Sequence, residues 1–523
     1  MPEESPNIGH LPVCCSSTSC FRCGASQITR RRFLTHAGAL AAGGLVLDGV
    51  PAARATKAPT RDLQPPIAGC LKVQPVLTYE IPERKRSTSW RAWGGLQTEK
   101  DLAQEKDRIG QELATMRKQA DFPLEILPLE AVQSVEAATE VARGSHDALV
   151  VYAAGGRAQV VEALTSAGKR NLMFIRHRSG PVYLWYEIVH PRFLRKMVDE
   201  YGQPGFGVQD VVVDNPAELV WRMRALGGLK NTLGKRIVAV GGPSGWGAGG
   251  RQAPDRAQAL WNLDIRTFSY ADLGERIKSA RQDTSLAKQC RDEAKKYLSQ
   301  KGITLETSQE FVSNAFILTA ILKQLMAEAE TNAITINQCM STIMPLSETT
   351  ACLPLSLLND QGHMAFCESD FVVIPSGILL HYISGKPVFL NDPTYPHDGI
   401  VTMAHCTAPR KMNGTDPEPA RILTHFESDY GAAPKVEMRK GQIVTVLDPD
   451  FASRRWMGFA GEVVGSPFLD ICRSQVDIGF KGNSERIAEE MRGFHWMASY
   501  GNYLRETGYA LKKMGVDWLD LSA

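Results

Sequence analysis

The stretch "VQPVLTYEI" (Val73–Ile81) decides the fold because of the pattern that follows it. A polar helical pattern comes next at Glu99–Gln119, "EKDLAQEKDRIGQELATMRKQ". Short apolar runs such as "ALVVYAA" then alternate with further helical patterns as far as Lys235. Strand and helix alternating at this spacing are typical of a parallel sheet with helices on both faces. We therefore predict an N-terminal α/β domain over residues 71–235.

A second series of alternating strand and helix patterns starts at "RIVAVGG" (Arg236–Gly242) and includes a long apolar helical pattern over Ser308–Asn332. It predicts a second α/β domain over residues 236–350. The remaining residues, 351–523, form short β-rich runs with many turns and a last helical pattern, "GNYLRETGYALKKMG". This texture is typical of an antiparallel barrel or sandwich. The expected fold is two Rossmann-like parallel-sheet α/β domains followed by a C-terminal antiparallel β-barrel-like domain.

The first 55 residues read as an export signal. "TRRRFLTHAGALAAGGLVLDGVPAARA" (Thr29–Ala55) has adjacent arginines, a short apolar segment rich in Ala and Gly, and a small-x-small end. This order indicates a twin-arginine signal, and hence the Tat translocase as a partner and a periplasmic or otherwise exported protein. The apolar segment is too short and too glycine-rich for a stable membrane span. The alternative is a tail in which the arginine run arose by chance.

Composition points to a small-molecule partner. Charged residues make up 22% of the chain and the formal net charge is +2, so attraction to nucleic acid or to anionic lipid has little basis. Four of the eleven cysteines lie in the leader and the other seven are scattered. An odd set without regular spacing does not indicate a disulfide framework. Cys367 and Cys406 flank candidate ligands, and on a strand their side chains would face away from them.

A glycine-rich loop, "VAVGGPSGWGAGGR" (Val238–Arg251), follows a predicted strand. Its glycines run G-x-G-x-G over Gly245–Gly249, Pro243 lacks an amide donor, and no P-loop lysine follows. We favour a mobile or substrate-facing loop over a nucleotide site.

The stretch "HMAFCESDFVV" (His363–Val373) places Glu368 and Asp370 in an otherwise apolar, strand-like run. A buried carboxylate is costly unless it is paired or binds a cation. Polar residues in similar apolar settings could supply the other ligands of such a cation: Glu348, His405 and His495. These residues are distant in sequence and meet only through the fold. Structural histidines and ordinary ion-paired acids remain the alternative.

Three motifs resemble the L-fucose and L-arabinose isomerase superfamily, and within it the fucose-isomerase-like members. They are "SETTACLPLSLLNDQGHMAFCESDF", "GIVTMAHCTAP" and "GFHWMASYGNYLRETGYALKKMG". The resemblance covers about the last third of the chain by motif and the earlier part by layout. The export signal and the segments outside these motifs depart from the two named enzymes, so the resemblance does not identify the sugar.

The resemblance implies a metal site made of Glu348, Glu368, His405 and His495, with the two glutamates as acid and base. Asp370, two residues beyond Glu368, would orient one of the metal ligands through a hydrogen bond, or would itself be a rival metal ligand. Two carboxylates with one or two imidazoles leave coordination positions open, which suits Mn²⁺ or another divalent cation better than a closed zinc site. The reaction implied is aldose–ketose isomerisation through an enediol.

A substrate-binding segment is expected at "TSWRAWGG" (Thr88–Gly95), after the first strand. Trp90 and Trp93 would stack on a sugar face and Arg91 would bind hydroxyl groups, although the tryptophans suit a domain or subunit interface equally well. In the enzymes that the chain resembles, a neighbouring subunit completes the active site. A homo-oligomer, a trimer or hexamer, is therefore expected.

Two other functions stay open. One is a non-catalytic, exported sugar-binding paralogue of the same fold. The other is a metal-dependent lyase or epimerase that shares the enediol step.

Overall fold

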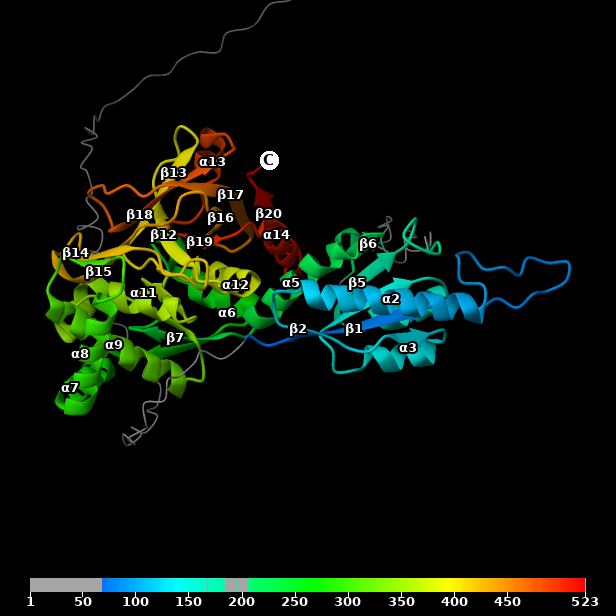
Figure 1. The fold of residues 1–523 in the computed structure, drawn as a ribbon, viewed down its shortest axis with the longest axis horizontal. Helices are drawn as coiled ribbons and strands as arrows, with labels where there is room; N and C mark the ends of the chain where they lie inside the picture. The colour runs from blue at the N-terminus through cyan, green and yellow to red at the C-terminus, as the bar shows by residue number, and fades with distance from the viewer. Residues whose placement is uncertain (1–67, 167, 184–193, 195–205, 523) are drawn as a thin grey trace, which may run out of the picture. The chain divides into compact units, whose positions relative to one another are not determined.

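A computed structural model describes residues 68–522, except 167, 184–193 and 195–205. The predicted signal therefore lies outside the described residues. Residues 62–523 form one compact unit. The expected combination of parallel-sheet α/β regions with a C-terminal antiparallel barrel is confirmed (Figure 1).

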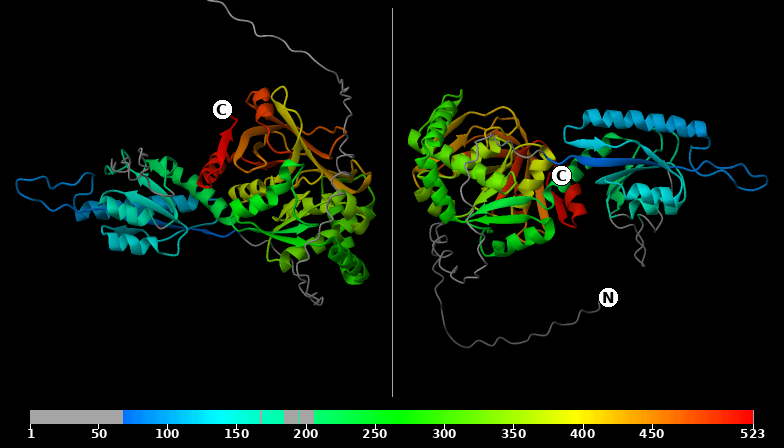
Figure 2. Two further views of the ribbon diagram at one scale, coloured as in Figure 1. Left: turned by 180° about the vertical axis from the view of Figure 1, so that it is seen from behind. Right: turned by 90° about the horizontal axis from the view of Figure 1, so that it is seen from below.

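The N-terminal region is an α/β layer with a six-stranded parallel sheet. Pro128 separates two short strands that pair with successive halves of the first strand, because a proline cannot donate to the ladder. Helices lie on opposite faces of this sheet in Figure 2. The strands are β1 (Leu71–Thr78), β2 (Leu124–Ile126), β3 (Glu130–Val132), β4 (Ala148–Ala153), β5 (Arg170–Ile175) and β6 (Val211–Val213), and the helices are α2 (Glu99–Gln119), α3 (Val135–Ala142), α4 (Ala158–Thr165) and α5 (Ala217–Thr232).

The second region is a four-stranded parallel sheet with the order β11-β10-β7-β8. Its last strand lies beyond residue 350, so the second sheet extends past the predicted domain boundary. The strands are β7 (Arg236–Val240), β8 (Asp264–Phe268), β10 (Ala333–Ile336) and β11 (Met364–Cys367), and the helices are α6 (Ala253–Trp261), α7 (Tyr270–Gln282), α8 (Thr284–Leu298), α9 (Gln309–Glu328), α10 (Met344–Ser347), α11 (Cys352–Asp360) and α12 (Ile374–Ser384).

Helix α9 is long and apolar enough to cross a membrane by length and composition alone. Half of this apolar stretch is buried, and the helix packs against α7, α8 and α11. These contacts are those of a core helix.

The C-terminal region is a closed antiparallel barrel. Six strands pair in the order β16-β19-β12-β13-β18-β17, and β17 pairs with β16 to close the ring. Its strands are β12 (Phe389–Pro393), β13 (Ile400–His405), β16 (Ile443–Pro449), β17 (Arg455–Gly465), β18 (Ser474–Phe480) and β19 (Trp496–Tyr500). Strand β20 (Asp517–Asp520) joins β17 in parallel, and β9 (Ile303–Leu305), β14 (Ala420–His425) and β15 (Tyr430–Val436) form a small separate sheet. Helices α13 (Ser484–Glu490) and α14 (Leu504–Lys513) complete the region.

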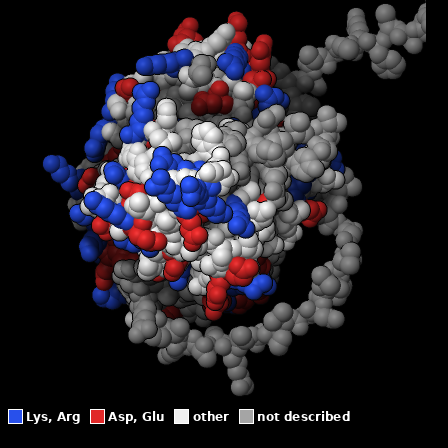
Figure 3. All heavy atoms as spheres, turned by 90° about the vertical axis from the view of Figure 1, so that its right-hand side faces the viewer, with Lys and Arg blue, Asp and Glu red and all other residues white. Residues whose placement is uncertain are grey.

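Charge is mixed on the surface of the described part. Figure 3 shows Lys and Arg side chains interspersed with Asp and Glu on the face that it draws. The near-zero net charge of the sequence fits this mixture.

Candidate metal centre

The backbone turns sharply at Glu368, immediately after β11. The φ angles of Glu368 and Ser369 are 63° and 47°, in the left-handed region that residues other than glycine rarely adopt. The predicted strand-like run therefore ends at Cys367, and Asp370 is not on the same strand as Glu368. Two successive residues in this conformation after a buried strand are costly, a feature that concentrates at functional sites.

Two histidines from distant segments lie beside Glu368. His405, the last residue of β13, has its Nε2 atom 3.7 Å from Glu368 Oε1. His495, just before β19, has its Nε2 atom 3.4 Å from Glu368 Oε2. Both imidazoles are buried, with side-chain exposures of 5% and 0%. Three of the four predicted ligands therefore lie together.

A carboxylate that sequence reasoning missed completes this group. Asp392, on β12, has its Oδ1 atom 3.2 Å from His495 Nε2. The signal was an acid in an apolar strand, "VFLNDP" (Val388–Pro393), the same signal that singled out Glu368. We call Glu368, Asp392, His405 and His495 the acid–histidine cluster.

Asp370 lies behind this cluster and holds His495. Its Oδ2 atom is 2.7 Å from His495 Nδ1, and its Oδ1 atom accepts the backbone N–H groups of Trp246 and Val372. The Asp370 carboxylate is 1% exposed. A carboxylate on one ring nitrogen fixes the orientation of the imidazole and directs the other nitrogen at a ligand.

Charge in the cluster is strongly coupled. Burial opposes ionisation of Glu368, but His405 and His495 outweigh it and hold the pKa of this carboxyl well below its usual range. Burial likewise disfavours protonated His495, but Asp370, Glu368 and Asp392 outweigh it and raise the pKa of the imidazole. Three acids around one buried imidazole require positive charge, which a proton or a cation can supply.

Glu348 lies in a different setting from the acid–histidine cluster. It follows α10 with a φ of 51°, and its side chain is 55% exposed. Its carboxylate pairs with Arg281 at 2.7 Å, and its carbonyl accepts from Asn314. Since α10 is only four residues long, the sequence pattern alone could not show that Glu348 ends a helix.

Cys367 departs from the expected orientation. Its sulfur lies within 4.8 Å of ligand atoms of Glu368 and His405, whereas strand alternation predicted that it would face away. The reason is the turn at Glu368, which breaks the alternation. The Cys367 sulfur is 3.4 Å from that of Cys339, and this contact together with burial raises the pKa of the thiol.

The glycine-rich loop lies against the cluster. Trp246 stacks on Phe494, with ring centroids 4.3 Å apart, and meets the edge of His495 at 5.4 Å. The loop folds back so tightly that a Cβ atom on Gly245 would lie 2.1 Å from the Gly250 carbonyl oxygen. The loop therefore borders the acid–histidine cluster.

The predicted substrate segment lies between β1 and α2, in the long blue loop of Figure 1. The guanidinium of Arg91 lies over the Trp90 ring at 5.2 Å, and Trp93 is 78% exposed. The role of this segment in substrate binding stays a prediction.

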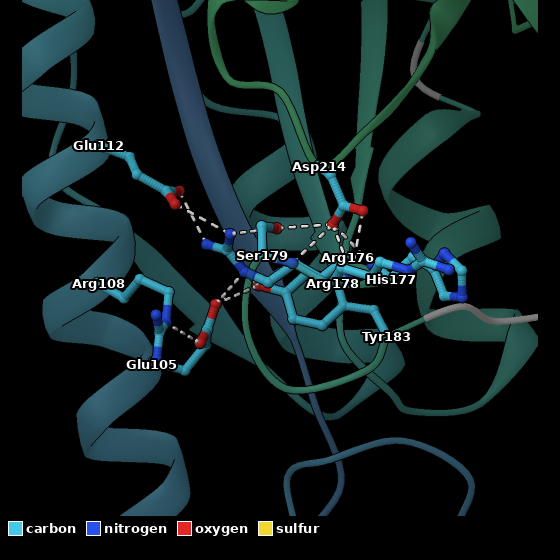
Figure 4. Close-up of polar contacts among 9 residues, drawn as sticks. All are labelled: Glu105, Arg108, Glu112, Arg176, His177, Arg178, Ser179, Tyr183 and Asp214. Carbon is cyan, nitrogen blue, oxygen red and sulfur yellow. Dashed lines mark hydrogen bonds and ion pairs between the residues drawn. The ribbon is translucent and has the colours of Figure 1, made fainter.

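A second polar cluster lies in the N-terminal region (Figure 4). Arg176, fully buried just after β5, pairs with Glu105 at 2.6 Å and with Glu112 at 2.8 Å. The Tyr183 hydroxyl donates to the same Glu105 carboxylate. Asp214, just after β6, accepts the backbone N–H groups of residues 177–179, which lowers the pKa of its carboxyl. These groups satisfy one another, and the cluster orders the ends of two neighbouring strands.

Comparison with known proteins adds no identification. No protein-family model matches the chain, and no curated protein matches it significantly.

Proposed function

We propose that the chain is a metal-dependent aldose–ketose isomerase and that the acid–histidine cluster is its active site. The observation that carries this proposal is the convergence of Glu368 Oε2 and Asp392 Oδ1 on His495 Nε2, at 3.4 and 3.2 Å. Within the described part of the chain, neither Glu368 Oε2 nor His495 Nε2 has a hydrogen bond of acceptable geometry. With Asp370 accepting from Nδ1, the Nε2 atom of the neutral ring would face carboxylate oxygens with a lone pair, an arrangement that a cation would stabilise.

The donor set fits a divalent ion. Glu368, Asp392 and His495 would hold it, with His405 as a further ligand. Oxygen and imidazole donors suit Mn²⁺, and fewer than six protein donors leave positions for a sugar diol. When bound, such an ion would polarise the sugar carbonyl. The proposal thus assigns to Asp392 the place that the resemblance gave to Glu348.

The residues themselves would bind the sugar and move its proton. Glu368 and Asp392 have side chains 19% and 18% exposed, whereas His495 is fully buried. Glu368 would take the proton from C2 and return it to C1 while a proton passes from O2 to O1, and the adjacent His405 would stabilise the ionised form of Glu368. The stacked Trp246 and Phe494 offer an aromatic surface beside the cluster for a sugar face.

The test uses a panel of pentoses, hexoses and deoxyhexoses with added Mn²⁺, and detects ketose formation. The proposal predicts activity in the wild type and its loss in Glu368→Gln and Asp392→Asn, with circular dichroism unchanged. Glu348→Gln separates the two ligand sets. It retains activity if Asp392 is the ligand and loses it if Glu348 is.

Other outcomes identify the alternatives. Sugar binding that survives both substitutions, without product from any sugar, indicates a binding paralogue. Deuterium exchange at C2 without ketose indicates the lyase or epimerase. The sugar, an oligomeric assembly and export through the Tat translocase remain proposals with separate tests.

A further inference from the structure

A second cluster of ligand-type residues lies apart from the acid–histidine cluster. Cys352, Cys406 and His425 are all buried, and one ligand atom from each lies within 4.8 Å of the others. Cys472 packs against Cys352 and Cys406. The Cys406 sulfur is in hydrogen-bonding contact with the sulfur atoms of Cys352 and Cys472. Two thiols and one imidazole therefore converge from three separate segments, and a third thiol, that of Cys472, adjoins the cysteines.

Each segment brings its residue to the cluster at the end of an element. Cys352 is the first residue of α11, and Cys406 follows β13 directly. His425 is the last residue of β14, and Cys472 precedes β18 by two positions. These residues are far apart in the sequence, and only the fold brings the ends of these elements together. Their spacing in the sequence therefore does not form a zinc motif.

We propose that Cys352, Cys406, Cys472 and His425 form a structural zinc site. Three thiolates and one imidazole are a donor set of closed tetrahedral zinc sites. Zn–S bonds of about 2.3 Å place tetrahedral sulfur atoms about 3.8 Å apart. The ligand atoms of Cys352, Cys406 and His425, which lie within 4.8 Å of one another, therefore need only small movements to bind the ion. Softer thiolate ligands also separate this site from the oxygen-rich acid–histidine cluster, which suits a harder ion.

The surroundings stabilise the charge that such a site would carry. Zinc with three thiolates has a net charge of −1. The Arg473 backbone N–H donates to the Cys406 sulfur at 3.4 Å, and the Arg473 guanidinium donates to the Thr424 carbonyl, next to His425. Cys352 lies in the first turn of α11, near the positive end of the helix dipole.

The histidine also has a partner of the kind that supports a metal ligand. His425 Nδ1 lies 3.2 Å from the Ser428 hydroxyl. A hydrogen bond at one ring nitrogen fixes the ring orientation for coordination through the other. Because Cys406 follows His405, a zinc ion here would also brace the end of β13 that carries this residue of the acid–histidine cluster.

The experiment measures zinc by mass spectrometry in the full-length chain, purified without chelators. We expect about one zinc per chain in the wild type and its loss in Cys352→Ala and Cys406→Ala. Cys290→Ala is the matched control, since Cys290 is a buried thiol on α8, outside the cluster. It should keep the zinc.

Two further variants separate this site from other places that could hold zinc. Glu368→Gln alters the acid–histidine cluster and should keep the zinc. Replacement of the four leader cysteines by serine should keep it as well: Cys14, Cys15, Cys20 and Cys23. Loss of the zinc in either variant overturns the assignment.

Titration of the wild-type protein with an organic mercurial gives a test that does not depend on variant folding. Zinc should be released, detected with a chromophoric chelator, as the thiols are modified. A wild type without zinc, no release on thiol modification, or a disulfide between two of the three cysteines in peptide mapping would each refute the site. Cobalt substitution should produce thiolate-to-metal charge-transfer absorption, and its absence would also refute it.

Discussion

At the scale of single residues, the position of one proton on His495 controls the acid–histidine cluster. Asp370 Oδ2 lies 2.7 Å from Nδ1, so the neutral ring carries its proton there and Nε2 presents a lone pair. Asp370 and His495 are both buried. Exchange between the two tautomers of the His495 ring therefore depends on the Asp370 carboxylate.

Asp370→Asn should disrupt this arrangement while keeping the shape of the side chain. Its Oδ1 atom would still accept from Trp246 and Val372. The new amide would donate to His495 Nδ1 and move the ring proton to Nε2, which then cannot bind a metal. We expect Mn²⁺ affinity to fall by about 10- to 100-fold in calorimetric titration. Unchanged affinity would show that His495 is not a ligand.

Ser369 offers a test of backbone strain at the same turn. Its φ of 47° is left-handed, and such a conformation costs an ordinary residue about 1 kcal/mol or more. Ser369→Gly should therefore raise the free energy of unfolding by about 1 kcal/mol. Ser376→Gly, a buried serine within helix α12, is the control and should lower it by about the same amount. Equal effects from both variants would contradict strain at Ser369.

Residue-level prediction from the sequence succeeded where chemistry alone sufficed. Glu368, His405 and His495 were selected as polar residues among apolar neighbours, and the structure places them together. Asp392 gives the same signal, but several acids have it and only the fold shows which ones meet. Glu348 has the signal too, yet it pairs with Arg281 at the surface.

At the scale of elements, periodic patterns were the most reliable guide. The predicted helix at residues 99–119 matches α2, whose N-terminus is capped by Thr98 and Asp101. The secondary structure of residues 363–373 is harder to predict, because an apolar run is compatible with a buried strand, a turn or the start of a helix. Pro375, in the first turn of α12, was the local sign that a helix begins there.

Contact between α5 and α12 permits a matched pair of glycine substitutions. A Cβ atom on Gly228 would lie 2.4 Å from Ile383 Cγ1, whereas one on Gly227 would meet nothing closer than 3.8 Å. Gly228→Ala should lower the free energy of unfolding by about 1–3 kcal/mol through overpacking. Gly227→Ala should raise it by about 1 kcal/mol, since alanine favours the helix. Urea denaturation measures both, and a stabilising Gly228→Ala would show that the helices do not pack this closely.

At the scale of the whole molecule, buried neutral histidines contribute to the response of stability to acid. His363 is 4% exposed, and burial lowers the pKa of its imidazole to about 4 from the ordinary 6.5. A folded-state pKa below the unfolded value gives stability that is present above pH 6.5 and is lost as pH falls through 4. Burial acts in the same direction on His146 and His381.

His363→Leu should make unfolding less sensitive to acid. Its effect on stability should be constant above pH 6.5 and should become more favourable between pH 6.5 and 4, by about 3 kcal/mol at most. Urea midpoints measured at several pH values provide the test. A variant curve parallel to that of the wild type over this window would mean that His363 is accessible to protons in the folded state.

The acid–histidine cluster draws its members from two separately hydrogen-bonded sheets. Glu368 follows a strand of the second parallel sheet, whereas Asp392 and His405 lie on barrel strands and His495 directly precedes another. Any ion seated there would cross-link the two layers, and its occupancy would register as a rise in melting temperature. Thermal-shift screening of metals, and then of sugars against the loaded protein, would therefore find ligands without a turnover assay.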